Sequence, residues 1–237
     1  MKLPIKRTSG KVDLSEIRML LYGPPKIGKS TLLSGFPDTL FLATEKGYGA
    51  LKVYATDIKS WKDFTEAVEL IVDGEHNYKT ICIDTADILV SLCLDYICDE
   101  LDITHISDED WGKGYDVFSK AFEKELNKLF MSPYGLIMTS HTKTSELTSR
   151  TGKITKTVPT LSNQARRIII PKVSLIGYMG MKTVKIDKNT YVEKRYLSFE
   201  PSETLEAGDR DGKMPEQFIV PKDPLKTYKI FADAYAK

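Results

Sequence analysis

The sequence is poor in the residues that bind transition metals or form disulfides. Its 237 residues include three cysteines, with no CxxC pair, and three histidines that lie far apart. An odd number of cysteines without paired spacing is typical of buried thiols in an intracellular protein rather than of a disulfide framework. We therefore expect no transition metal held by protein side chains.

Long hydrophobic runs are absent as well. The N-terminal cations Lys2, Lys6 and Arg7 are not followed by an apolar stretch of signal-peptide length, and the apolar run at 19–22 is too short to cross a bilayer. The sequence therefore predicts a cytoplasmic protein that does not contact membranes.

Charge of one sign is not in excess. There are 34 Lys and Arg residues against 33 Asp and Glu residues, which gives a net charge of +1. The field of the whole molecule therefore does not drive binding to nucleic acid or to a membrane. Any contact with nucleic acid must come from a local patch. The remaining composition, with 41% hydrophobic and 10% aromatic residues, is that of a globular protein.

Short apolar runs alternate with amphipathic ones up to about residue 141. Residues 18–22, 39–43, 79–83 and 135–139 have the pattern of buried strands. Apolar side chains at helical spacing predict a helix from Ser60 to the stop at Asp73-Gly74, and further helices over 88–97 and 115–130. This alternation predicts an α/β fold with a mostly parallel sheet flanked by helices.

The character of the chain changes after residue 141. Residues 142–163 are rich in Thr and Ser and poor in apolar side chains, which predicts a long polar loop. Residues 172–181 and 191–199 fit a β-hairpin, and a last helix is expected to begin at Asp223-Pro224. No linker rich in Gly, Pro or Ser interrupts the chain. We expect one domain over 1–237, with a core over about 15–200 and a C-terminal β-hairpin extension that continues over about 200–237.

Residues 23–30, with the sequence GPPKIGKS, match the phosphate-binding pattern GxxxxGK[ST] in full. The pattern stands between a predicted strand and a predicted helix, which is the context that it requires. Glycines let backbone N–H groups turn toward phosphate oxygens, and the helix directs its positive dipole end at them. We expect Lys29 to reach the β- and γ-phosphates and Ser30 to bind Mg²⁺. The predicted nucleotide-binding residues are Gly23, Pro24, Pro25, Lys26, Ile27, Gly28, Lys29, Ser30 and Thr31.

Asp84 ends the predicted strand at 79–83, where a Mg²⁺–triphosphate site usually takes a second carboxylate. An aspartate that only caps the following helix is the alternative, and the two roles are compatible. The next residue is Thr85 rather than glutamate. The group that activates water must therefore come from elsewhere in the chain.

Two further side chains are expected at this edge of the sheet. Glu45 follows the strand directly after the P-loop helix, and His141 follows the strand at 135–139. Because ligands bind at the carboxyl edge of a parallel sheet, Glu45 is the best candidate for the catalytic base. His141 is a candidate to sense the γ-phosphate or to polarise the attacking water. A solvated Glu45 and a structural His141 are the alternatives.

The order of these segments resembles the RecA-type ATPase core, specifically the compact phage ATPases of this type that act in single-strand annealing and recombination. The resemblance is carried by GPPKIGKST, TLFLATE, ICIDTAD and LIMTSHTK, together with EPSETLEAGDRDGKMPE in the late part of the chain. It runs from about residue 15 to about residue 200. The chain departs from the pattern at His141, where RecA has glutamine, and it shows no recognisable additional DNA-binding domain.

The resemblance implies an enzyme that hydrolyses ATP with Mg²⁺. Glu45 would activate water, Asp84 would hold the metal together with Ser30, and His141 would act as the sensor. The segments 102–113 and 142–163 would face single-stranded DNA. The second segment has no aromatic residue, so its contacts would be electrostatic. Its cations are Lys143, Arg150, Lys153 and Lys156, against the single acid Glu146.

RecA-like sites lie between subunits, so the resemblance also implies a homo-oligomer, either a ring or a filament, with a basic group supplied in trans. Lys194 and Arg195 are the first candidates for that group and Arg210 is the second. A single-strand-binding protein is a further partner of this class. Two other functions are kept open: a DNA-annealing protein that uses nucleotide only as a switch, and a P-loop small-molecule kinase. A kinase usually needs an Arg-rich lid, and residues 142–163 contain only Arg150.

Overall fold

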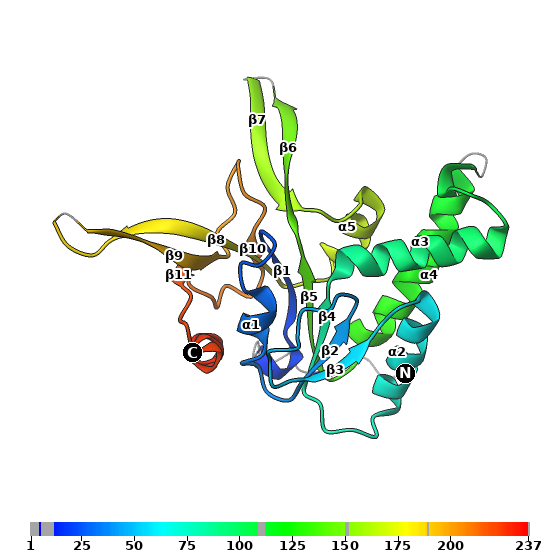
Figure 1. The fold of residues 1–237 in the computed structure, drawn as a ribbon, viewed down its shortest axis with the longest axis horizontal. Coiled ribbons are helices and arrows are strands. Elements are labelled where there is room, and N and C mark those ends of the chain that lie inside the picture. The colour runs from blue at the N-terminus through cyan, green and yellow to red at the C-terminus, as the bar shows by residue number, and fades with distance from the viewer. Residues whose placement is uncertain (1–4, 6–11, 109–111, 150–151, 189, 237) are drawn as a thin grey trace.

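The computed structural model describes residues 5, 12–108, 112–149, 152–188 and 190–236. In this part of the chain, nine strands form one sheet in the order β11-β9-β8-β1-β5-β4-β2-β3, with β10 beside β8 (Figure 1). The central pairs are parallel and the pairs that involve β9, β10 or β11 are antiparallel. The strands are β1 (Arg18–Tyr22), β2 (Thr39–Ala43), β3 (Tyr54–Asp57), β4 (Thr80–Asp84), β5 (Gly135–Ser140), β8 (Leu175–Lys185), β9 (Tyr191–Ser198), β10 (Gly208–Asp209) and β11 (Gln217–Ile219).

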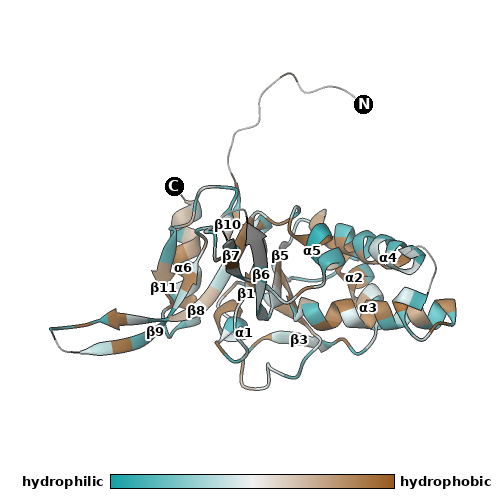
Figure 2. Cartoon of the chain, turned by 90° about the horizontal axis from the view of Figure 1, so that it is seen from above, coloured by the Kyte–Doolittle hydropathy of each residue, from teal (hydrophilic) through white to brown (hydrophobic). Residues whose placement is uncertain are grey.

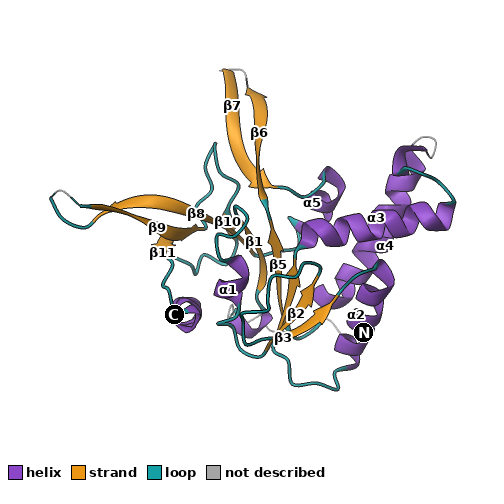
Figure 3. Cartoon of the chain, in the orientation of Figure 1, coloured by secondary structure: helices purple, strands orange, loops and turns teal. Residues whose placement is uncertain are grey.

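Helices cover both faces of this sheet (Figure 3). Successive residues of β1 point to opposite faces, so Leu20 packs into one core and Met19 and Leu21 pack into the other. The first core is shared with α2, α3, α4 and α5, and the second with α1 and α6. The helices are α1 (Lys29–Leu33), α2 (Trp61–Asp73), α3 (Ala86–Leu101), α4 (Lys113–Phe130), α5 (Asn163–Ile169) and α6 (Pro224–Tyr235), with short 3₁₀ turns η1 (Leu14–Glu16) and η2 (Ile106–Asp108).

The predicted α/β class with a mostly parallel sheet flanked by helices is confirmed. The four predicted strands correspond to β1, β2, β4 and β5, and the predicted helices to α2, α3, α4 and α6. Helix α2 shows how directly sequence fixes such an element. Ser60 and Asp63 form a reciprocal capping box at its start, and Gly74 ends it with a φ of 77°.

The prediction of a long polar loop over 142–163 is wrong. Two strands, β6 (Thr142–Ser149) and β7 (Gly152–Pro159), form an antiparallel hairpin that projects from the body of the molecule, and α5 begins directly after it (Figure 1). The scarcity of apolar residues was misleading because most of a projecting hairpin stays in contact with solvent, whereas Val158, near the base of β7, is buried. The threonines favour extended backbone, since their branched Cβ suits a pleated strand.

The predicted hairpin near the C-terminus is present as β8 and β9, with Met179 opposite Leu197 and Met181 opposite Arg195. It is not an appendage to the core, because β8 also pairs in parallel with β1. Its outer half leaves the sheet and projects from the body, as two perpendicular views show (Figures 1 and 2). The elements after residue 200 add to the same sheet and pack α6 against Phe36.

No helix in the described ranges is long and apolar enough to cross a membrane.

Candidate nucleotide-binding site

The segment between β1 and α1 has the geometry of a phosphate-binding loop. Gly28 takes a φ of 104° at the start of α1, a conformation that glycine adopts without steric cost. At Gly23, an added Cβ would lie 2.2 Å from the Met179 carbonyl oxygen, so the close approach of β8 also requires glycine. The two fixed glycines of the motif are therefore explained by backbone shape. The loop lies at the carboxyl edge of the sheet, where ligands bind in folds of this class.

Lys29 points back into the loop. Its side chain is buried, and its Nζ donates to the carbonyl oxygens of Gly23 at 2.9 Å and Pro24 at 3.1 Å. Burial lowers the pKa of Lys29, although Asp84, Asp87 and Glu45 act in the opposite direction. An ammonium group that is held by two carbonyls and largely stripped of water can exchange these partners for phosphate oxygens. This is the role that the sequence predicted for Lys29.

Ser30 and Asp84, the predicted magnesium ligands, are hydrogen-bonded to each other. The Ser30 hydroxyl donates to Asp84 Oδ2 at 2.6 Å, and the Thr139 hydroxyl donates to the other carboxylate oxygen. Hydroxyl and carboxylate oxygens suit Mg²⁺, which commonly binds through one or two carboxylates together with substrate phosphates. Within the described ranges, no group of three or more His, Cys, Asp or Glu side chains could hold a metal by itself. The site therefore fits a Mg²⁺ ion that arrives with a nucleotide.

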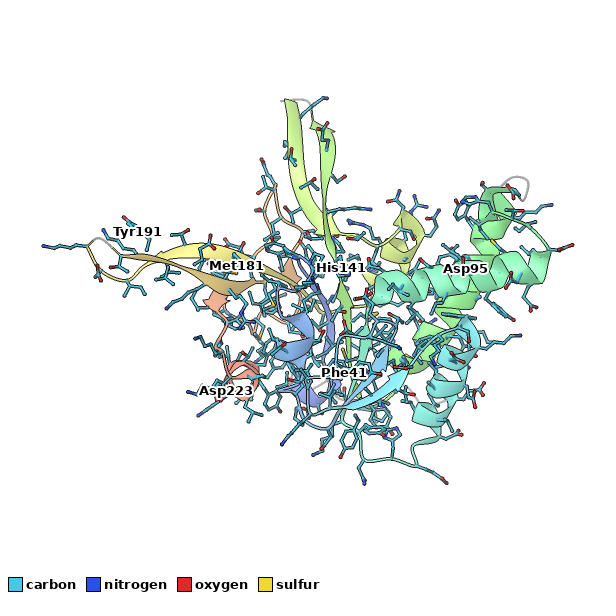
Figure 4. All side chains as sticks on the ribbon, viewed as in Figure 1. Phe41, Asp95, His141, Met181, Tyr191 and Asp223 are labelled. Carbon is cyan, nitrogen blue, oxygen red and sulfur yellow. The ribbon has the colours of Figure 1, made fainter. Side chains whose placement is uncertain are left out.

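Glu45 and His141 come together across the edge of the sheet, although 96 residues separate them. His141 Nε2 lies 3.4 Å from Glu45 Oε1, and the Thr85 hydroxyl donates to the same oxygen at 3.3 Å. The Glu45 side chain remains 42% exposed, so it is accessible to water and substrate. His141 lies just beyond β5 in the centre of the molecule (Figure 4). The structure thus brings both predicted groups to the edge that carries Lys29 and Asp84.

A set of hydrogen bonds ties the end of β2 to the end of β4. The Thr44 N–H donates to the Asp84 carbonyl at 2.8 Å, and the Thr85 N–H donates to the Thr44 hydroxyl oxygen at 2.8 Å. The Thr44 hydroxyl in turn donates to the Thr85 carbonyl at 3.0 Å, and the Asp84–Thr85 peptide bond is cis. These contacts fix Glu45 relative to Asp84. Sequence reasoning missed the roles of both threonines, because Thr44 only precedes Glu45 and Thr85 only follows Asp84.

Asp87 is a further site residue that sequence reasoning missed. One carboxylate oxygen accepts from the His141 N–H at 3.0 Å, and the other accepts from the Ser140 hydroxyl at 3.0 Å. Burial raises the pKa of Asp87, and these hydrogen bonds oppose that shift. Asp87 therefore anchors the end of β5 and the backbone of His141. Its place three residues after Asp84, in the sequence DTAD, was the signal available.

Arg195 lies against the P-loop of its own chain. Its Nη1 donates to the Ile27 carbonyl at 3.4 Å and would be 2.4 Å from a Cβ placed on Gly28. The resemblance implies that Arg195 acts at the site of a neighbouring subunit, whereas this contact is made within one chain. Lys194 extends from the opposite face of β9, because successive side chains of a strand alternate. Arg210 donates to the Pro171 carbonyl at 2.7 Å, near the amino end of β8.

The predicted DNA-binding cations belong to the β6–β7 hairpin. Lys143 donates to the Thr160 carbonyl at 3.3 Å, and Lys153 pairs with Glu146 at 3.5 Å across the strands. Lys156 and Lys143 line one cavity of about 360 Å³ with Arg166, whose charge is matched by Glu206. Arg150 lies outside the described residues. Of the cations that the structure describes here, Lys143 and Lys153 are exposed and Lys156 is half-buried.

Comparison with known proteins agrees with this geometry. A model of the AAA domain family matches residues 15–211, and the chain belongs to this family of P-loop ATPase domains. The chain is also similar to the SPbeta prophage-derived uncharacterized protein YorG of Bacillus subtilis (strain 168), with 23% identity over 184 residues. That match covers 75% of this chain and 55% of the relative. The chain therefore spans about half the length of the curated relative it matches.

Proposed function

We propose that the protein is a Mg²⁺-dependent ATPase of the RecA-like type that binds single-stranded DNA and acts in phage DNA recombination, annealing or replication, in the host cytoplasm. The observation that carries the ATPase is one constellation at the carboxyl edge of the sheet. There, the Ser30 hydroxyl lies 2.6 Å from Asp84 Oδ2, and His141 Nε2 lies 3.4 Å from Glu45 Oε1. Both pairs lie beside the buried Lys29.

Each group in this constellation has a defined task in phosphoryl transfer. Lys29 binds the β- and γ-phosphates of ATP, and Ser30 and Asp84 hold Mg²⁺, which neutralises charge on the phosphates when bound. Glu45 orients or deprotonates the attacking water, and Thr85 and His141 hold its carboxylate in place. Because Asp87 fixes the His141 backbone, His141 keeps its position relative to Glu45.

Two observations support the role in phage DNA metabolism. The curated relative is described as prophage-derived. The β6–β7 hairpin carries cations on a projecting element, which suits electrostatic contact with a phosphate backbone. We further propose a homo-oligomer, either a ring or a filament, and a single-strand-binding protein as partner. With Arg195 at its own P-loop and Lys194 extending from the opposite face of β9, Arg210 is the remaining candidate for a trans-acting cation.

Phosphate release is the test. Purified protein should hydrolyse ATP continuously, and single-stranded DNA should raise the rate. Lys29→Ala should abolish turnover, because it removes the main positive charge on the β- and γ-phosphates. Binding of ATP without sustained release would favour the nucleotide-switched annealing protein. Transfer of phosphate to a small molecule rather than to water would favour the kinase.

A further inference from the structure

A row of tyrosines extends from the sheet onto the β8–β9 hairpin. The rings of Tyr22 and Tyr178 have centroids 5.2 Å apart, and those of Tyr178 and Tyr196 lie 6.0 Å apart. Gly180, which is opposite Tyr196, makes this row possible. A Cβ on Gly180 would lie 2.7 Å from the Tyr178 ring and 3.0 Å from the Tyr196 ring. The glycine therefore leaves the space that both rings occupy.

Two lysines continue the row toward the tip of the hairpin. Lys182 and Lys194 are directly opposite each other in the antiparallel register. Like charges in this arrangement repel and destabilise a strand pair, unless an anion lies between them. Lys182 Nζ donates to Gln217 Oε1 at 2.8 Å and lies 5.3 Å from the Tyr196 ring centroid. Among the described residues, neither lysine has an acidic partner.

The register also places these residues on one face and the acids elsewhere. The pairs on this face are Tyr178 with Ser198, Gly180 with Tyr196, Lys182 with Lys194, and Val184 with Val192. The opposite face carries Glu193 and Arg195, and Arg195 reaches the P-loop. We call the four residues Tyr178, Tyr196, Lys182 and Lys194 the tyrosine–lysine face. It offers aromatic rings and positive charge without an acid.

We propose that the tyrosine–lysine face binds single-stranded nucleic acid, with bases stacked on Tyr178 and Tyr196 and phosphates held by Lys182 and Lys194. This combination of π-faces and cations is how proteins bind single strands with little sequence preference. Tyr178 and Tyr196 are half-buried, so their rings are supported and still accessible. The face supplies the aromatic contacts that residues 142–163 lack. The proposal rests on the proposed function and assigns a second nucleic-acid contact to it.

The same row connects this face to the base of the other projecting hairpin. The Tyr22 hydroxyl lies 2.6 Å from the Glu206 carbonyl and 3.2 Å from the carbonyl of Thr157 on β7. On β9, Arg195 at the P-loop stands between Lys194 and Tyr196 in the chain. A nucleic-acid strand bound at Lys194 or Tyr196 on one face of β9 is therefore one residue away from Arg195, which contacts the phosphate-binding loop on the other face.

Fluorescence anisotropy with a labelled oligo(dT) strand tests the stacking contact. Tyr196→Ala should weaken binding by on the order of tenfold, the loss expected from one stacked base, whereas Tyr196→Phe should keep near wild-type affinity. Tyr191→Ala is the matched control, because Tyr191 is exposed and the register places it on the opposite face of the same hairpin. An abasic strand should not distinguish Tyr196→Ala from the wild type.

The cationic contact has its own readout. Lys182→Gln and Lys194→Gln should each make the log–log salt dependence of binding shallower by about 0.7, the coefficient for one phosphate of a single strand. Lys185→Gln, on the opposite face, should leave the slope unchanged.

Wild-type protein that fails to bind oligo(dT) would overturn DNA binding in the proposed function. If the wild type binds and these variants bind equally well, only the tyrosine–lysine face is overturned. A change in oligomer mass with unchanged affinity would identify an interface between copies instead and would also overturn it.

Discussion

At the scale of single residues, Glu45 is the group whose chemistry can be separated most cleanly from binding. Its carboxylate contacts Thr85 and His141 but no group of the P-loop, so Glu45→Gln should still bind ATP. Hydrolysis should fall by roughly 10²–10⁴-fold, the contribution of general-base catalysis. Phosphate release and equilibrium nucleotide binding, measured side by side, check both halves of this expectation.

The control for this variant is Glu75→Gln, which removes the same charge from an exposed position before β4, at the opposite edge of the sheet. It should hydrolyse ATP at the wild-type rate. Wild-type turnover in Glu45→Gln would show that another residue serves as the base.

Asp84 should act through the metal rather than through water. Its carboxylate accepts from Ser30 and Thr139, so an amide of the same shape keeps the fold but is a poorer ligand for Mg²⁺. Asp84→Asn should therefore shift the Mg²⁺ dependence of ATP hydrolysis to higher concentration. A magnesium titration of the initial rate measures this shift. Asp73→Asn, at the exposed end of α2, is the matched control, and a titration of Asp84→Asn that overlays the wild type would exclude Asp84 as a ligand.

At the scale of elements, the β6–β7 hairpin is predicted to contribute to DNA binding through charge alone. Changing Lys143, Arg150, Lys153 and Lys156 to Gln should weaken binding to single-stranded DNA and leave ATP hydrolysis without DNA nearly intact. With one phosphate per cation, the log–log salt slope should become shallower by about 3 per subunit. Anisotropy at several salt concentrations measures it. Unchanged affinity and slope would remove this hairpin from the DNA contact.

Elements with a buried face were predictable from sequence, and elements without one were not. The run TICID is apolar because β4 is covered on both faces, and Phe64, Val68 and Ile71 recur on α2 because one face of that helix is buried. The hairpin β6–β7 lacks such a pattern, and β3 has only four residues, with Tyr54 exposed. Such elements are specified by pairing with neighbours, which a local sequence pattern does not report.

Some residues of the candidate site could likewise be predicted from sequence, and others could not. The P-loop, Asp84, Glu45 and His141 could be predicted, because each follows a recognisable strand and has a side chain with evident chemistry. Thr85 and Asp87 act by holding other site residues, and their roles depend on contacts between strands. Arg195 was singled out for its charge, but the side of β9 from which it extends depends on the register with β8. A shift of one residue would turn it away from the P-loop.

At the scale of the whole molecule, the position of Arg195 predicts how an oligomer behaves when two variants are mixed. Arg195→Gln leaves Lys29 intact, and Lys29→Ala leaves Arg195 intact. If Arg195 served a neighbouring site, mixed oligomers would contain sites with both groups and would regain activity. Because the guanidinium contacts Ile27 of its own chain, every site in the mixture should lack one of the two groups. We expect ATP hydrolysis of the mixture to equal the sum of the two variants measured separately. Mass determination must show that the subunits have exchanged, and a rise above that sum would place Arg195 at a neighbour's site.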